Sequence, residues 1–144
     1  MKFEKMFSPI QIGPIEVKNR FVVPPMGNNF ANTDGTMSDQ SVAYYGARAK
    51  GGFGLITLEA TVVHKGAKGG PRKPCLYDDS AIPSFKKVID ACHAEGAKVS
   101  IQLQNAGPEG NAKNAGAPIQ QLQQLHLQME EIFQKQLQQS RFMN

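Results

Sequence analysis

The sequence predicts an α/β fold with buried parallel strands, and three observations support this prediction. Continuous apolar runs rich in β-branched residues recur along the chain, as in strands that are covered on both faces. Segments with apolar residues at helical spacing separate these runs. Each such segment is long enough for the crossover that parallel strands need. Two architectures fit this order, namely a doubly wound sheet and a (β/α)8 barrel.

The first expected elements follow in chain order. Residues 7–18 form a small hairpin, because Pro and Gly break their short apolar runs. The first core strand covers residues 20–26 and is stopped by two prolines, which lack the N–H that a sheet requires. Ser38 caps a helix from Asp39 to Lys50, and Gly51 follows as its C′ residue.

The remaining expected elements complete the alternation of strands and helices. Residues 53–63 form a second, nearly continuous apolar strand. A second helix begins near Pro83 and ends at Gly96. Residues 98–103 form the third strand. The apolar face of the second helix is set by spacings of three and four residues: Phe85, Val88, Ile89 and Cys92.

The loop after the first strand bears on the choice between the two architectures. A dinucleotide-binding sheet would carry G-x-G-x-x-G at this place. Residues 24–28 read PPMGN instead, which favours the barrel. Pattern alone leaves the choice nearly even.

Composition limits the classes of protein that the chain can represent. It has 144 residues, 40% of them hydrophobic and 19% charged, as in one globular domain. The net charge of +4 is too mild and too scattered to indicate nucleic-acid binding. No apolar stretch approaches the roughly 18 residues of a membrane span. Cys75 and Cys92 have neither metal-ligand spacing nor a disulfide framework, so we expect no metal and a cytoplasmic location.

A break in composition divides the chain into residues 1–119 and a tail of residues 120–144. All 14 Gly and all 9 Pro precede Gln120, and Gln and Leu dominate after it. Helical spacing relates Leu122, Leu125, Met129 and either Ile132 or Phe133, so the tail is expected to form a helix that packs on the open sheet edge or self-associates. The alternative is a shifted reading frame, since a CAG run read in another frame encodes Ala or Ser.

The frame-shift interpretation makes a testable prediction. One shifted frame after the codon for Ile119 is expected to encode an Ala- or Ser-rich loop followed by another β/α pattern. The nucleotide sequence of this region provides the measurement. Three frames that all lack such a pattern would eliminate the idea.

Residues 7–119 contain a series of short motifs in a fixed order. They read FSPI (7–10), VKNRFVVPPM (17–26), YY (44–45), RAKGGFGLI (48–56), LEAT (58–61), LYDDS (76–80), AEGAK (94–98), QL (102–103) and AG (106–107). Each motif is weak alone, but together, in this order and spacing, they resemble the Old Yellow Enzyme and 2,4-dienoyl-CoA reductase family of flavin-dependent ene-reductases.

The resemblance implies the N-terminal part of an FMN-binding (β/α)8 barrel, with three strands and two helices present. It implies hydride transfer from NADH or NADPH to FMN and on to the activated C=C bond of an enone or enoyl substrate. It also places five residues at the flavin. Pro25, Met26, Gly27 and Ala60 would pack at the ring, and the Gln102 amide would pair with its pyrimidine edge.

The chain departs from the family pattern at two places. Many members have Thr or Cys where this chain has Gly27, so the side-chain contact that tunes the flavin is missing. Many members have His and Arg after the third strand, where Asn105 and Pro108 stand here. These departures indicate a divergent branch or relaxed constraints.

Other candidate residues favour structural roles. His64 and the basic residues Lys65, Lys68, Arg72 and Lys73 are expected in solvated loops, although they could meet substrate or phosphate. Glu59 is expected in a structural ion pair, and Cys92 in the core. Cys75 has no predictable role.

The residues that the family uses to anchor substrate, supply the proton and hold phosphate would lie further along a complete barrel, as would the iron–sulfur cysteines of longer relatives. No catalytic residue is therefore assigned, and the chain alone is expected to be an inactive fragment. The alternative is a non-catalytic remnant or interaction protein that associates through its Gln-rich tail.

Overall fold

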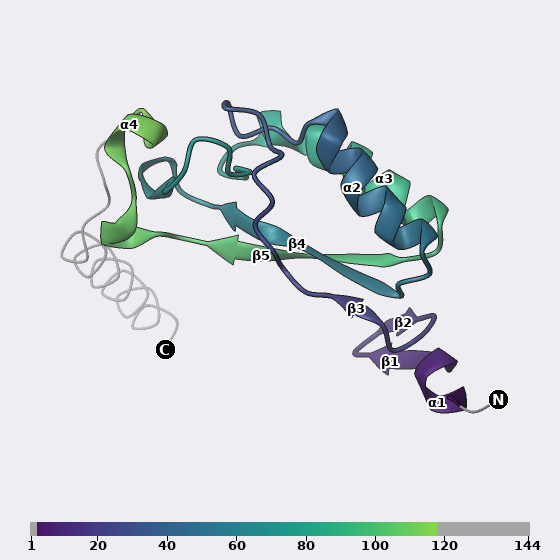
Figure 1. The fold of residues 1–144 in the computed structure, drawn as a ribbon. Coiled ribbons are helices and arrows are strands. Elements are labelled where there is room, and N and C mark those ends of the chain that lie inside the picture. The colour runs from purple at the N-terminus through teal and green to yellow at the C-terminus, as the bar shows by residue number, and fades with distance from the viewer. Residues whose placement is uncertain (1–2, 118–144) are drawn as a thin grey trace, which may run out of the picture.

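A three-stranded parallel sheet forms the centre of the molecule. The computed structural model describes residues 3–117, and its sheet has the order β3-β4-β5. The strands are β3 (Val22–Val23), β4 (Leu55–Val62) and β5 (Lys98–Gln104) (Figure 1). The expected three parallel core strands are thereby confirmed, with β4 paired along both of its edges.

Two helices connect the three strands. Helix α2 (Asp39–Lys50) has the expected bounds, and the Ser38 hydroxyl accepts a hydrogen bond from the Ser41 N–H at 3.2 Å. The expectation for Gly51 was wrong by one residue. Gly51 has a φ of −68°, whereas Gly52 has the left-handed φ of 99° that turns the chain out of the helix.

Helix α3 (Ile82–Ala94) also agrees with the sequence pattern. Pro83 lies in its first turn, where a missing N–H costs no helical hydrogen bond. Gly96, with a φ of 71°, reverses the chain toward β5. Both ends of this helix therefore follow from Pro and Gly at fixed positions.

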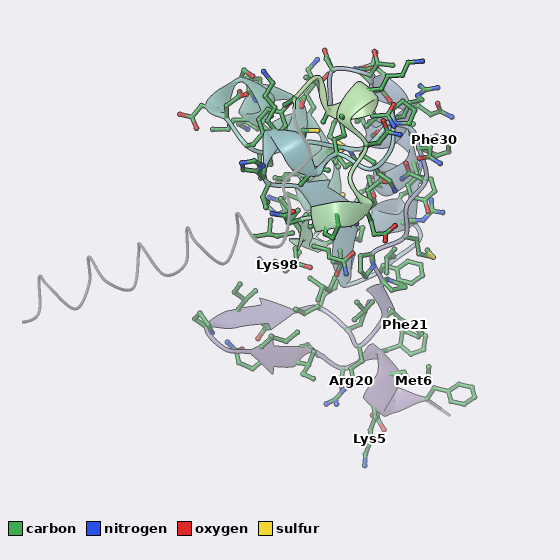
Figure 2. The ribbon with its side chains drawn as sticks, turned by 90° about the vertical axis from the view of Figure 1, so that its left-hand side faces the viewer. Lys5, Met6, Arg20, Phe21, Phe30 and Lys98 are labelled. Atoms are coloured by element: carbon green, nitrogen blue, oxygen red, sulfur yellow. The ribbon has the colours of Figure 1, made fainter. Side chains whose placement is uncertain are left out.

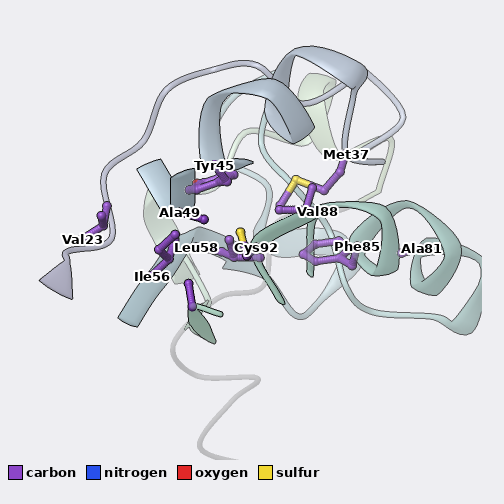
Figure 3. Packing of buried hydrophobic residues seen from close by; sticks show 11 residues of the cluster. Val23, Met37, Tyr45, Ala49, Ile56, Leu58, Ala81, Phe85, Val88 and Cys92 are labelled. Carbon is purple, nitrogen blue, oxygen red and sulfur yellow. The ribbon is translucent and has the colours of Figure 1, made fainter. Parts of the chain in front are cut away.

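The main core lies between one face of the sheet and both helices (Figure 3). From the sheet come Ile56 and Leu58, both fully buried. From the helices come Tyr45, Val88 and Cys92, which confirms the core position expected of Cys92. Burying side chains of this size contributes about 1.5–3 kcal/mol each. The two crossovers thus cover the same face of the sheet.

The first core strand is shorter than expected. Only Val22 and Val23 pair with β4, opposite Leu55 and Ile56. Pro24 follows directly and has no N–H to donate, so the chain leaves the sheet as a loop. Before α2 begins, this loop reaches β4, where the Asn28 N–H donates to the Glu59 carboxylate.

The N-terminal segment forms the expected hairpin from β1 (Ile10–Ile12) and β2 (Ile15–Val17), preceded by α1 (Glu4–Phe7). Figure 2 shows Lys5, Met6, Arg20 and Phe21 at this end of the molecule and Phe30 at the opposite end. Phe21 lies 5.2 Å from the Phe7 ring, measured between centroids. The hairpin therefore adjoins the amino ends of the core strands.

The remaining elements are short. They are η1 (Lys65–Ala67), η2 (Asp79–Ala81), η3 (Gly107–Glu109) and α4 (Ala112–Ala115). Within residues 3–117, no helix is long and apolar enough to cross a membrane. The predictions for the tail, residues 120–144, fall outside the described residues.

Candidate functional site at the carboxyl ends of the strands

A β-bulge in β4 forms the centre of the candidate site. Leu58 pairs with Ile101 and Thr61 pairs with Leu103, so β4 has one more residue than β5 over this interval. Glu59 and Ala60 together therefore stand opposite Gln102. The bulge brings two of the residues that the resemblance places at the flavin, Ala60 and Gln102, to neighbouring positions on adjacent strands.

The loop after β3 reaches the same bulge. The backbone N–H of Asn28 donates to Oε2 of Glu59 at 3.2 Å. The Asn28 side chain in turn accepts from the N–H of Phe30 at 2.9 Å, which orders the turn that follows. These bonds anchor the segment that contains Pro25 and Met26 beside the ends of β4 and β5. Pro25 is half-buried, and Met26 is 48% exposed.

Gln102 lies on the face of the sheet opposite the helices. Its neighbour two residues earlier, Ser100, shares a hydrogen bond of 2.8 Å with the Thr57 hydroxyl across the strands. Side chains two residues apart lie on the same face of a strand, which places Gln102 on this polar side. The Gln102 side chain is exposed and makes no hydrogen bond to any residue in the described part of the chain. Both its N–H and its C=O are therefore open to a ligand.

Glu59 is the buried charged group of the site, with 0% of its surface exposed. Its backbone N–H donates to the Tyr45 hydroxyl at 3.0 Å, and burial raises the pKa of that Tyr45 hydroxyl to about 12. Oε1 of Glu59 has no hydrogen-bond partner among residues 3–117. Burial raises the pKa of the Glu59 carboxyl, although the Asn28 N–H and the charge of Lys73 partly oppose the shift.

The expectation of a structural ion pair for Glu59 was wrong. Among residues 3–117, the oppositely charged side chains that lie within ion-pair distance are Lys86 and Asp90 on the surface of α3, and Glu59 is not one of them. Glu59 instead uses its carboxylate to hold a backbone N–H of the adjacent loop. Its position in the bulge explains the difference, because the bulge directs the residue toward the loop after β3.

The raised pKa of Glu59 predicts a pH-dependent stability. A carboxyl whose folded-state pKa lies above its unfolded value leaves stability unaffected below both values. Stability then falls as the pH rises from the unfolded pKa through the folded pKa. We expect Glu59→Gln to remove the contribution of this carboxyl to the fall in stability with rising pH, as measured by thermal unfolding. The control variant Glu16→Gln, which changes an exposed carboxyl, should show the same fall in stability as the wild type. An unchanged decline in Glu59→Gln would contradict this assignment.

A comparison with models of protein families shows the family to which this chain belongs. The model of the NADH:flavin oxidoreductase / NADH oxidase family matches residues 5–143. The chain belongs to this family. The match extends through most of the Gln-rich segment, whereas the pairwise alignments below cover 104 and 106 residues. The frame-shift interpretation stays a prediction.

Individual relatives of this NADH:flavin oxidoreductase chain agree with the family assignment. It is 41% identical over 106 residues to an NADH oxidase of Thermoanaerobacter brockii, covering 73% of this chain and 16% of the relative. It is 39% identical over 104 residues to an NADPH dehydrogenase of Listeria monocytogenes serotype 4b, covering 72% of this chain and 31% of the relative. The chain therefore spans less than a third of either relative.

Solved structures show the same arrangement of strands and helices. A 2-naphthoyl-CoA reductase in complex with 2-naphthoyl-CoA aligns with a TM-score of 0.74 and 36% identity, over 78% of this chain and 17% of that one. The old yellow enzyme from Trypanosoma cruzi aligns with a TM-score of 0.72 and 30% identity, over 79% and 30%. The resemblance seen in the sequence motifs is confirmed, as is the α/β fold with a parallel sheet.

The basic loop of this chain departs from the expected solvated loop at Lys68, whereas Lys65 and Arg72 are exposed as expected. Lys68 is only 4% exposed, and its ammonium donates to the Thr33 carbonyl at 2.6 Å. Arg72 donates through Nε to the Ala31 carbonyl at 3.1 Å. These two side chains join the loop after β4 to the loop after β3. Sequence spacing gives no signal for such contacts between distant loops.

His64 and the cysteines have structural roles in the described part of the chain. Nδ1 of His64 accepts from the Gly66 N–H at 3.1 Å and so caps η1, in agreement with its expected loop position. Cys75 is buried with Val62 and Ala67 in a small second cluster. Among residues 3–117, no three His, Cys, Asp or Glu side chains are grouped so that they could hold a metal ion.

Proposed function

We propose that residues 1–119 form the first three strands and two helices of an FMN-binding (β/α)8 barrel. Family membership and the parallel sheet with both crossovers on one face support this proposal. The complete enzyme is an oxidoreductase that uses NADH or NADPH, since the names of relatives include both an NADH oxidase and an NADPH dehydrogenase.

One observation carries the proposal. The loop after β3 and the bulge of β4 meet through the bond from Asn28 to Glu59, and the bulge stands opposite Gln102. Three separate chain segments thus converge at the carboxyl ends of parallel strands. Active sites of (β/α)8 barrels lie at this end, because the loops that follow the strands gather there.

The chemistry of these residues fits a flavin ring. Pro25, Met26 and Ala60 offer apolar surface beside the site, and the Gln102 amide offers a donor and an acceptor for the paired groups of a pyrimidine edge. Bound FMN would supply the hydride acceptor and donor. The residues of this segment would bind and orient the ring, and none of them is assigned to proton transfer.

The names of relatives support a proposal for the substrate class. One solved neighbour is named a 2-naphthoyl-CoA reductase and contains 2-naphthoyl-CoA. We infer that the complete enzyme accepts a small enone or enoyl compound and reduces its activated C=C bond. A complete barrel that contains this segment should copurify with FMN and, in the absence of oxygen, oxidise NADPH when an enone is added. A colourless complete barrel would contradict the proposal and would favour a non-catalytic association function instead.

A further inference from the structure

Gly27 stands where a side chain would collide with Lys73. A Cβ placed on Gly27 would lie 2.8 Å from the Lys73 Nζ and 3.8 Å from Oε2 of Glu59. Gly27 is not among the residues with a left-handed φ, so its backbone conformation does not require glycine. Glycine at position 27 therefore matters because it leaves room for the end of the Lys73 side chain. The volume that a side chain would fill is occupied by an ammonium group.

Lys73 differs from its basic neighbours in the same loop. Lys68 and Arg72 are each bound to a backbone carbonyl of the loop after β3. The Lys73 ammonium, by contrast, has neither a hydrogen bond nor an ion pair to any residue in the range 3–117. Its N–H donors are therefore open to a ligand, although its charge also acts on the nearby Glu59 carboxyl.

The buried carboxylate of Glu59 explains why the Lys73 ammonium is located here. Glu59 is fully buried, and one of its oxygens has no hydrogen-bond partner in the described chain. A carboxylate in such surroundings attracts a nearby cation more strongly than it would in water. Since Gly27 has no side chain, the Lys73 ammonium can occupy the space beside it and approach this carboxylate at the end of the bulge.

We propose that Lys73 places a positive charge beside the flavin ring, in the space that a side chain at position 27 would occupy, and thereby favours the reduced flavin. This inference rests on the proposed function, which places Pro25 and Met26, the residues before Gly27, at the ring. Hydride transfer brings two electrons and one proton to its acceptor and so adds one negative charge. A fixed cation at the acceptor stabilises that charge and raises the reduction potential.

The first test concerns the contact itself and uses the complete barrel without flavin. The lysines are reductively methylated with 13C, and the Lys73 resonance is assigned with Lys73→Met. Gly27→Ala is expected to shift the Lys73 signal and to leave that of Lys65 unchanged. The variant should keep its fold, because the colliding atom is the end of a flexible side chain. An unshifted Lys73 signal would overturn the inference.

The second test measures the reduction potential in the flavin-loaded complete barrel. We expect Lys73→Met to weaken binding of reduced relative to oxidised FMN by about tenfold, which lowers a two-electron potential by ~30 mV. Lys73→Arg should retain most of the potential, and Lys65→Met, a matched charge removal in the same loop, should not change it. Gly27→Ala should lower the potential, and adding it to Lys73→Met should have no further effect.

The outcomes separate this inference from the proposed function. Bound flavin with an unchanged potential in Lys73→Met would overturn the role of Lys73 and leave the proposed function intact. Additive effects of Gly27→Ala and Lys73→Met would also overturn it, because the two residues would then act independently. A wild-type barrel that does not bind FMN would contradict the proposed function, and this inference with it.

Discussion

A polypeptide of these 144 residues, mixed with excess FMN and passed through a gel-filtration column, is expected to emerge without bound flavin. The ring could meet Pro25, Ala60 and Gln102, but (β/α)8 barrels hold the phosphate with loops after their seventh and eighth strands. The sheet of the described residues has three strands. A dianionic phosphate left in water adds little binding free energy, so ring contacts alone should give weak binding.

The same polypeptide is expected to be marginally stable and prone to aggregation. Within the described sheet, β3 and β5 are the two edges, and unpaired edges can pair with other chains. Leu103 is 64% exposed on β5, which adds apolar surface to one edge. Two copies supply six strands rather than eight, so a dimer does not restore a barrel.

Two measurements check the expectation for the isolated polypeptide. The first is the flavin absorbance retained after gel filtration, and the second is NADPH oxidation in the presence of a simple enone. Matched runs with a complete NADPH dehydrogenase relative provide the positive control. Stoichiometric flavin with turnover in the 144-residue chain would show that three strands are sufficient for both binding and catalysis.

Replacement of Gln102 is expected to produce the largest effect of a single substitution in a complete barrel. Gln102→Ala removes a donor and an acceptor that we propose to pair with the flavin ring. Leaving buried partners unpaired costs about 1–3 kcal/mol per group. The affinity for FMN should therefore fall by roughly one to two decades, as measured by fluorescence titration of the apoenzyme.

Gln40→Ala, which removes an exposed amide from the first turn of α2, provides the matched control and should leave FMN affinity unchanged. Thermal unfolding of both apoenzymes separates loss of affinity from loss of structure. If Gln102→Ala bound FMN as tightly as the wild type and had the same reduction potential, the assignment of Gln102 to the ring would be wrong.

Local signals in the sequence predicted the regular elements well. Ser38 and the residues after it determined α2 to the residue, because an N-cap depends on groups only a few positions apart. Pro83 and Gly96 delimited α3 for similar reasons. The barrel could not be separated from a doubly wound sheet by such signals, because both use the same β/α units.

The contacts that build the candidate site were not predictable from local signals. The extra residue of β4 leaves a continuous apolar run unchanged in the sequence, so the bulge at Glu59 was missed. The burial of Lys68 and the position of Lys73 beside Gly27 depend on two loops that meet only in the folded chain. The five proposed flavin residues were found through family motifs, and their roles stay proposals.

The bulge in β4 has a consequence for aligning homologous sequences. Before it, Ile56 and Leu58 share the helix-covered face with Val99 and Ile101, whereas after it Thr61 is the residue opposite Leu103. Odd and even positions of the strand thus exchange faces at Glu59 and Ala60. A homologue with one residue fewer here would have to re-sort every side chain between this point and the loop. A one-residue gap at this position in an alignment therefore marks a rebuilt binding site rather than a harmless change of length.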